Sequence, residues 1–79
     1  MALVKRSLSL HGHRTSLALE PEFWEVVDGY ISAEKRSLAS LIAEVDDNRD
    51  PDDPLSSAVR VWALQQAQSA GNHSISRKD

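Results

Sequence analysis

The sequence predicts a mostly α-helical domain with a short β element at its N-terminus, and two observations indicate this class. A basic residue followed by alternating leucines occurs twice near the start, as KRSLSL over residues 5–10 and as HRTSLALE over residues 13–20. After residue 20, apolar side chains recur at helical spacing in three stretches that are separated by charged or turn-forming residues. The predicted element order is therefore strand, strand, helix, helix, helix.

The two leucine pairs constrain how the strands are joined, because side chains of a β-strand alternate between its two faces. Leu8 and Leu10 occupy even positions, whereas Leu17 and Leu19 occupy odd ones, so one uninterrupted strand would send the pairs to opposite faces. A bulge at Gly12 would bring both leucine pairs to the same face, and so would a two-residue hairpin turn at positions 11 and 12. The hairpin would put all four leucines on one face through these pairs: Leu10 with His13, Leu8 with Thr15, and Arg6 with Leu17. Its opposite face would be polar and basic, with Lys5, Ser7, Ser9, Arg14, Ser16 and Ala18.

Three helices are expected after the strands. Pro21 suits the first turn of a helix over residues 21–34, whose apolar stripe is Phe23, Val27, Tyr30 and Ile31. Ser37 can cap a second helix with an apolar face of Leu38, Leu41, Ile42 and Val45. The proline- and aspartate-rich stretch 46–54 predicts a solvated loop, and a third helix follows it and fades after Gln68. Residues 1–12 form a strand or arm, residues 13–69 the main domain, and residues 70–79 a disordered tail in this prediction.

Length and composition limit the class of protein. A chain of 79 residues has room for one domain with a modest core, and it contains no cysteine for disulfides, so we expect an oligomer. No apolar stretch has the length of a membrane span or the pattern of a signal peptide, which predicts a cytoplasmic protein that does not contact membranes. The net charge of −3 is uneven, because residues 21–54 carry ten acidic against three basic side chains. This distribution argues against strong nonspecific DNA affinity but allows one basic face.

The residues that could support catalysis or metal binding are few. The chain has no nucleophile motif and no phosphate-binding glycine loop, so an enzyme is not expected, and no cofactor is implied. The imidazoles of His11 and His13 have no partner ligand at a suitable spacing in the sequence, so we interpret them as part of a turn and predict no metal site. The aspartates of residues 46–54 lack the glycine and closing glutamate of a calcium loop.

The stretch RTSLALEPEFWEVVDGYISAEKRSLASLIAEV, residues 14–45, resembles the ribbon-helix-helix family of Arc/MetJ-type dimeric transcription regulators. More narrowly, HRTSLALEPEFW, SLASLIAE and LSSAVRVWAL resemble a small bacterial subfamily of short ribbon-helix-helix proteins. The resemblance implies an intertwined homodimer in which strands of both chains pair as an antiparallel ribbon that enters the DNA major groove. This chain would add a strand before that ribbon and a third helix after the second one.

Carried over by position, the resemblance implies which residues would contact DNA and which would form the dimer core. Arg14, Ser16 and Ala18 would face the bases, and the start of the second helix at Ser37, beside Arg36, would meet a phosphate. If the first strand is a mobile arm, Lys5 and Arg6 would help to bind DNA. The dimer core would contain Leu17, Leu19, Phe23, Val27, Leu38, Leu41 and Ile42.

The sequence also favours an alternative. The middle of the chain is acidic, whereas a DNA-binding surface is usually basic. The additional strand is also not expected in a simple two-stranded ribbon. A dimeric protein-interaction module, including an antitoxin-like one with a partner at the third helix, would keep the fold without binding DNA. The predicted function is sequence-specific DNA binding as a small transcription regulator, with this module as the second hypothesis.

Overall fold

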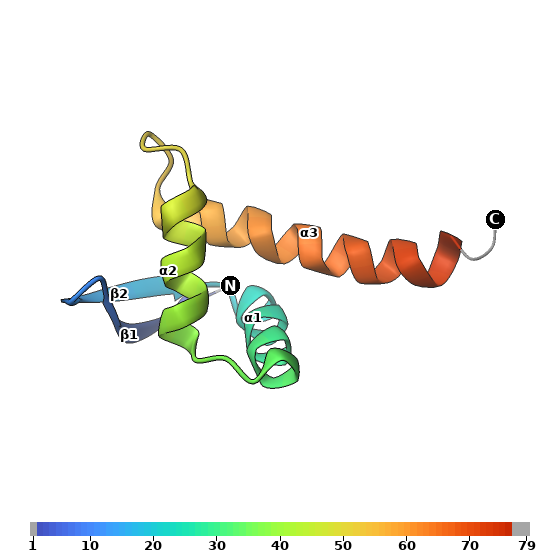
Figure 1. The fold of residues 1–79 in the computed structure, drawn as a ribbon, viewed down its shortest axis with the longest axis horizontal. Helices are drawn as coiled ribbons and strands as arrows, with labels where there is room; N and C mark the ends of the chain where they lie inside the picture. The colour runs from blue at the N-terminus through green and yellow to red at the C-terminus, as the bar shows by residue number, and fades with distance from the viewer. Residues whose placement is uncertain (1, 77–79) are drawn as a thin grey trace.

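The elements follow the predicted order along the chain (Figure 1). The computed structural model describes the backbone of residues 2–76 and the side-chain surroundings of residues 2–69. It contains β1 (Val4–Leu10), β2 (His13–Leu19), α1 (Pro21–Glu34), α2 (Leu38–Asn48) and α3 (Leu55–Ser76). The prediction of a mostly helical domain with a short N-terminal β element is therefore confirmed.

The two strands form an antiparallel hairpin with the predicted register. Leu10 pairs with His13, Leu8 with Thr15, and Arg6 with Leu17. The turn residues His11 and Gly12 have φ angles of 51° and 81°, as a two-residue type I′ turn requires. Residues 5–10 are thus one strand of a hairpin, and neither a bulged continuation nor a free arm.

We expect the same substitution to have opposite effects at two glycines. Gly12→Ala places a Cβ at a positive φ, which costs about 1–2 kcal/mol of stability, although no atom lies within 4 Å of that Cβ. Gly29→Ala lies within α1 and also meets no atom within 4 Å, so it should stabilise the fold by about 1 kcal/mol. Urea unfolding of both variants measures the two shifts, and a stabilising Gly12→Ala would contradict the observed turn.

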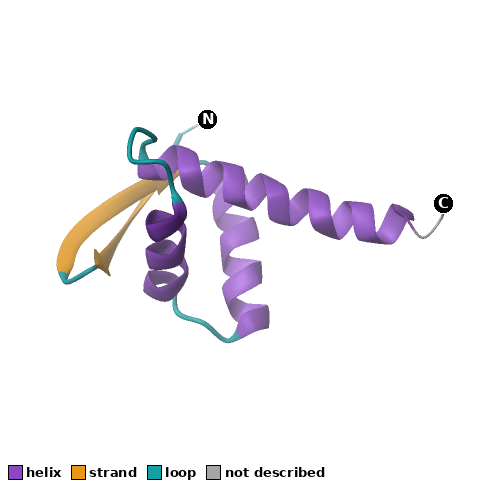
Figure 2. Cartoon of the chain, turned by 45° about the horizontal axis from the view of Figure 1, so that its top comes forward, coloured by secondary structure: helices purple, strands orange, loops and turns teal. Residues whose placement is uncertain are grey.

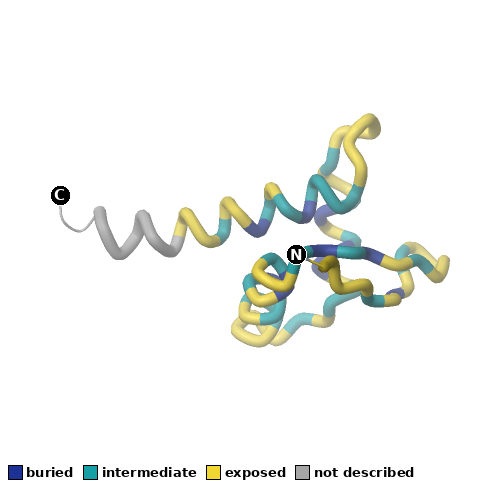
Figure 3. The backbone as a smooth tube through the Cα atoms, turned by 180° about the vertical axis from the view of Figure 1, so that it is seen from behind, coloured by how far each residue is buried: buried dark blue, intermediate teal, exposed yellow. Residues whose placement is uncertain are grey.

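The leucine face of the hairpin supplies one side of a core that a single chain completes. Leu8, Leu17 and Leu19 are buried there against residues of all three helices: Trp24, Val27, Leu41, Ile42, Val45 and Val59. Figure 3 shows these buried positions along the strands and on the inner sides of the helices. Phe23 and Leu38 are partly buried and pack against this cluster. The predicted core residues therefore share one core within the chain, and their role in a dimer interface stays a prediction.

The helix α3 lies across α1 and α2 and extends beyond both (Figures 1 and 2). Its Trp62 ring meets the Tyr30 ring of α1 edge to face, with 4.9 Å between the ring centroids. The backbone of α3 is described as helical to Ser76. The disordered tail predicted over residues 70–79 stays a prediction, and residues 77–79 of it lie outside the described chain. None of the described helices has the length and apolar character needed to cross a membrane.

Candidate nucleic-acid interface

The outer face of the hairpin is polar and basic, and no residue among 2–69 covers it. The register places three cross-strand pairs on it, namely Lys5 with Ala18, Ser7 with Ser16, and Ser9 with Arg14. All of these side chains are exposed except that of Ala18, which is partly exposed. The face carries two positive charges near its opposite ends and no carboxylate. The helices pack on the other side of the sheet, so this face can meet a large ligand.

Lys5 and Arg14 on this face differ in their surroundings from the other arginines whose side chains the structure describes. Four arginines pair with carboxylates of the chain at N···O distances of 2.7–2.8 Å: Arg6 with Asp28, Arg36 with Glu44, Arg49 with Asp46, and Arg60 with Glu20. Within the described part of the chain, Lys5 and Arg14 make neither an ion pair nor a side-chain hydrogen bond. Their charges are therefore available to an anionic partner, and they lie on the same face as Ser16 and Ala18.

Arg6, a predicted DNA contact, lies on the leucine face of the hairpin and connects β1 to α1. Its guanidinium donates two hydrogen bonds to the carboxylate of Asp28, at 2.8 and 2.9 Å, and lies 4.2 Å from the centroid of the Trp24 ring. The Trp24 Nε1–H donates to the Val4 carbonyl at 2.7 Å. These contacts hold β1 on α1, so the structure gives Arg6 a role in attaching the first strand.

The Arg6–Asp28 pair predicts a pH dependence of stability. Hydrogen bonds from Arg6 lower the pKa of Asp28, so the pair stabilises the fold above the unfolded carboxyl pKa, about 3.9, and this contribution is lost as the pH falls through the lower folded pKa. Both side chains are partly exposed, so we expect Asp28→Asn to cost about 1 kcal/mol or less at pH 7. Urea unfolding at several pH values should show the difference from the wild-type protein shrinking as the pH falls below the unfolded carboxyl pKa of about 3.9. Glu25→Gln on the same helix is the control, and a difference that persists at low pH would contradict this account.

The other predicted phosphate contact, at the start of α2, is engaged within the chain. The Ser37 hydroxyl caps the helix by accepting a hydrogen bond from the Ser40 backbone N–H at 3.1 Å. Arg36 donates to the Ser40 carbonyl and hydroxyl, and its ion pair with Glu44 raises the pKa of the guanidinium. Ser37 and Arg36 thus belong to the connection between α1 and α2, apart from the sheet that carries Arg14.

Two groups of residues were not predicted as sites from the sequence. Ser7 and Ser9 join Arg14 and Ser16 on the outer face, and the alternation of the hairpin was the signal for them. His11 at the hairpin turn meets Asp46 and Asp47 of α2, which are more than 30 positions later in the chain. The spacing of residues in the sequence cannot predict this contact, because it forms only when the hairpin packs on α2.

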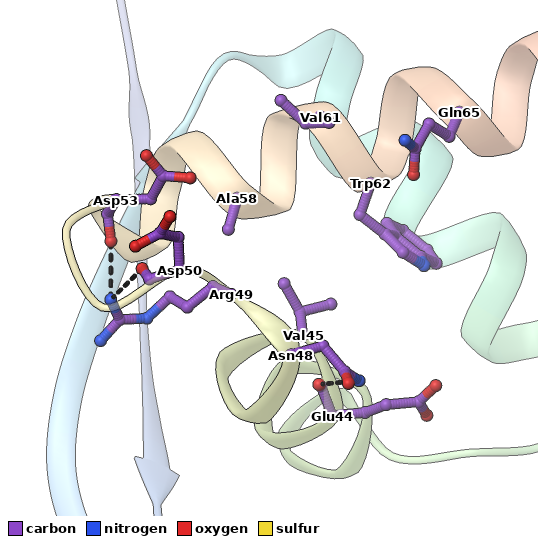
Figure 4. A pocket seen from close by; sticks show the side chains of 10 residues that line it. All are labelled: Glu44, Val45, Asn48, Arg49, Asp50, Asp53, Ala58, Val61, Trp62 and Gln65. Atoms are coloured by element: carbon purple, nitrogen blue, oxygen red, sulfur yellow. Dashed lines mark hydrogen bonds between the residues drawn. The ribbon is translucent and has the colours of Figure 1, made fainter.

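A pocket of about 280 Å³ opens between the last turn of α2, the loop of residues 49–54 and α3 (Figure 4). Its apolar wall includes Val45, Ala58, Val61 and Trp62, and its rim carries three carboxylates, from Glu44, Asp50 and Asp53. Arg49 donates hydrogen bonds to the Asp50 and Asp53 carbonyls, at 3.4 and 2.6 Å, and so holds the loop in place. The acidic rim repels phosphates, whereas the outer face of the hairpin is basic and attracts them.

Comparison with protein families adds an independent finding. A family model described as a ribbon-helix-helix domain matches residues 3–67, which include both strands, α1, α2 and α3 as far as residue 67. No curated protein and no solved structure matched the chain significantly. The matched region covers most of the sequence and contains the entire hairpin and core. The chain therefore belongs to the ribbon-helix-helix domain family.

Proposed function

We propose that this protein is a homodimeric, sequence-specific DNA-binding transcription regulator that contacts DNA through the outer face of its β-hairpin. Ribbon-helix-helix domains are commonly DNA-binding regulators or antitoxins, a regulatory class of fold and not a catalytic one. The observation that carries the proposal is the outer face itself, where Arg14 and Lys5 are exposed and unpaired by any described residue. An uncovered, basic, two-stranded surface is the kind of element that enters a major groove.

Each residue type on this face suits a particular contact. The Arg14 guanidinium can donate two hydrogen bonds to the N7 and O6 atoms of one guanine. Serine hydroxyls at positions 7, 9 and 16 can donate to or accept from several bases, and the Ala18 methyl group can contact a thymine methyl group. Lys5, at the other end of the face from Arg14, suits a backbone phosphate.

The hairpin changes how the ribbon is assembled in this proposal. Neighbouring strands are about 4.8 Å apart, so two hairpins joined edge to edge would span about 14 Å between their outermost backbones. The major groove is about 12 Å wide and admits a two-stranded ribbon. We therefore place one hairpin in each groove segment, with β1 supplying the second strand that a partner chain would otherwise contribute. Two protomers related by a two-fold axis would then read two halves of a pseudo-palindromic site.

Fluorescence anisotropy with a random-sequence duplex at low and moderate salt tests the proposal. We expect binding that weakens steeply with salt. Lys5 and Arg14 of each protomer would displace counterions from the DNA phosphates. Lys5→Ala should make the slope of log affinity against log salt less negative by about 1 per DNA-contacting lysine. Absence of binding by the folded protein even at low salt would reject the proposal.

A second candidate function is a protein-interaction module, which the surface of α3 favours. Val61 and Leu64 are about half exposed on this helix, and Val61 also lines the pocket with the acidic rim. Such a surface suits an apolar partner segment with basic flanks. Leu64→Asp tests which surface contacts DNA, because it should leave DNA affinity unchanged if the hairpin face binds DNA. A folded Leu64→Asp variant that loses DNA affinity would show that α3 takes part in that binding.

A further inference from the structure

We propose that His11, Asp46 and Asp47 form a binding site for one divalent transition-metal ion at the tip of the hairpin. His11 belongs to the turn between the strands, whereas the two aspartates lie in the last turns of α2. The ligand atoms of the three side chains lie within 4.8 Å of one another. One imidazole nitrogen with carboxylate oxygens suits ions such as zinc, manganese or cobalt, and the remaining coordination positions would hold water.

The separations between these atoms fit a common ion. His11 Nε2 lies 3.0 Å from Asp47 Oδ1 and 3.4 Å from Asp46 Oδ2. Two ligand atoms each about 2.1 Å from one ion lie about 3.0 Å apart at a right angle and about 3.4 Å apart at the tetrahedral angle. Both separations between His11 and the aspartates therefore match two ligands of one ion, and the ligand atoms of the two aspartates lie within 4.8 Å of each other.

Asp46 is also oriented as a metal ligand requires. Its Oδ1 accepts a hydrogen bond from Arg49 Nε at 2.7 Å, which leaves Oδ2 directed toward His11. The Asp46 side chain is only 19% exposed, so its conformation is restricted. Hydrogen bonds of this kind to the second oxygen commonly fix ligating carboxylates. His13, the other imidazole of the hairpin, is not part of the cluster.

The turn provides a variant that removes the imidazole without unfolding the hairpin. Asparagine before glycine is the preferred pair for a type I′ turn, so His11→Asn keeps the positive φ that position 11 requires. Asp47→Asn removes an exposed carboxylate from the same cluster. His13→Asn is the matched control, because it makes the same chemical change two residues away.

Isothermal titration of the full chain with zinc chloride at pH 7 tests the site, with magnesium chloride for comparison. We expect zinc to bind with one ion per chain, and His11→Asn and Asp47→Asn each to weaken it by at least about 10-fold. His13→Asn should keep the wild-type affinity, and zinc should raise the melting temperature only where the site is intact. Absence of saturable binding would overturn the proposal, and so would binding that His11→Asn leaves unchanged. The titration contains no DNA, so its result is independent of the proposed function.

Discussion

Replacing Arg14 by alanine is expected to reduce the affinity for a specific DNA site by about 10- to 100-fold per bound protomer, because a bidentate arginine–guanine contact contributes about 1–3 kcal/mol. The change should not affect folding, since Arg14 is exposed and makes no ion pair within the described chain. A site selected from a random duplex pool, followed by anisotropy titration of both proteins, measures the loss.

Two further variants separate the charge of Arg14 from its shape. Arg14→Lys keeps the positive charge but lacks the planar fork, so it should retain salt-dependent affinity for random DNA and lose preference for the selected site. Arg60→Ala removes an arginine that is paired with Glu20 away from the outer face, and it should bind DNA as the wild type does. Wild-type affinity of Arg14→Ala for the selected site would contradict the assignment of Arg14 as a base contact.

Replacing Ile42 by alanine is expected to destabilise the fold by about 2–5 kcal/mol, since its side chain is fully buried where α2 meets the hairpin and the other helices. Small domains are stable by only about 5–15 kcal/mol, and a 79-residue chain should lie near the lower end, so much of its stability would be lost. Urea unfolding followed by the fluorescence of Trp24 and Trp62, which both contact the core, measures this change.

The control for Ile42 is Leu64→Ala on α3. The Leu64 side chain is 52% exposed, and we expect its truncation to change the stability by at most about 0.5 kcal/mol. A small effect of Ile42→Ala in the isolated chain would contradict a core that one chain completes. It would instead favour a core that forms only when two chains associate.

The sequence limited the first strand to a hairpin, a bulged strand or a mobile arm, and it predicted the apolar faces that form the core, because these features depend on local pattern. Leu10 is at an even position and Leu17 at an odd one, so a turn or a bulge was needed between them. Gly12 lies in this segment and suits either. The cap at Ser37 and the first helical turn at Pro21 are also local, and both are found as predicted.

The contacts that the sequence did not predict join distant positions. Arg6 and Asp28 are 22 residues apart, and Glu20 and Arg60 are 40 apart, so only the packing of strands on helices brings them together. For the same reason the sequence showed His11 as a turn residue and gave no sign of its aspartate neighbours. It also could not distinguish Arg14 from the paired arginines, because the distinction lies in which carboxylates the fold places nearby.

The most direct test of the central claim is a nuclear magnetic resonance titration of isotope-labelled protein with duplex DNA. The outer face of the hairpin is predicted to bind, so the largest shifts should occur at the backbone amides of residues 5–9 and 14–18. Smaller shifts are expected on α3 around Val61 and Leu64, which lie outside that face. Shifts centred on α3 with an unperturbed hairpin would contradict the claim and would support the interaction-module function.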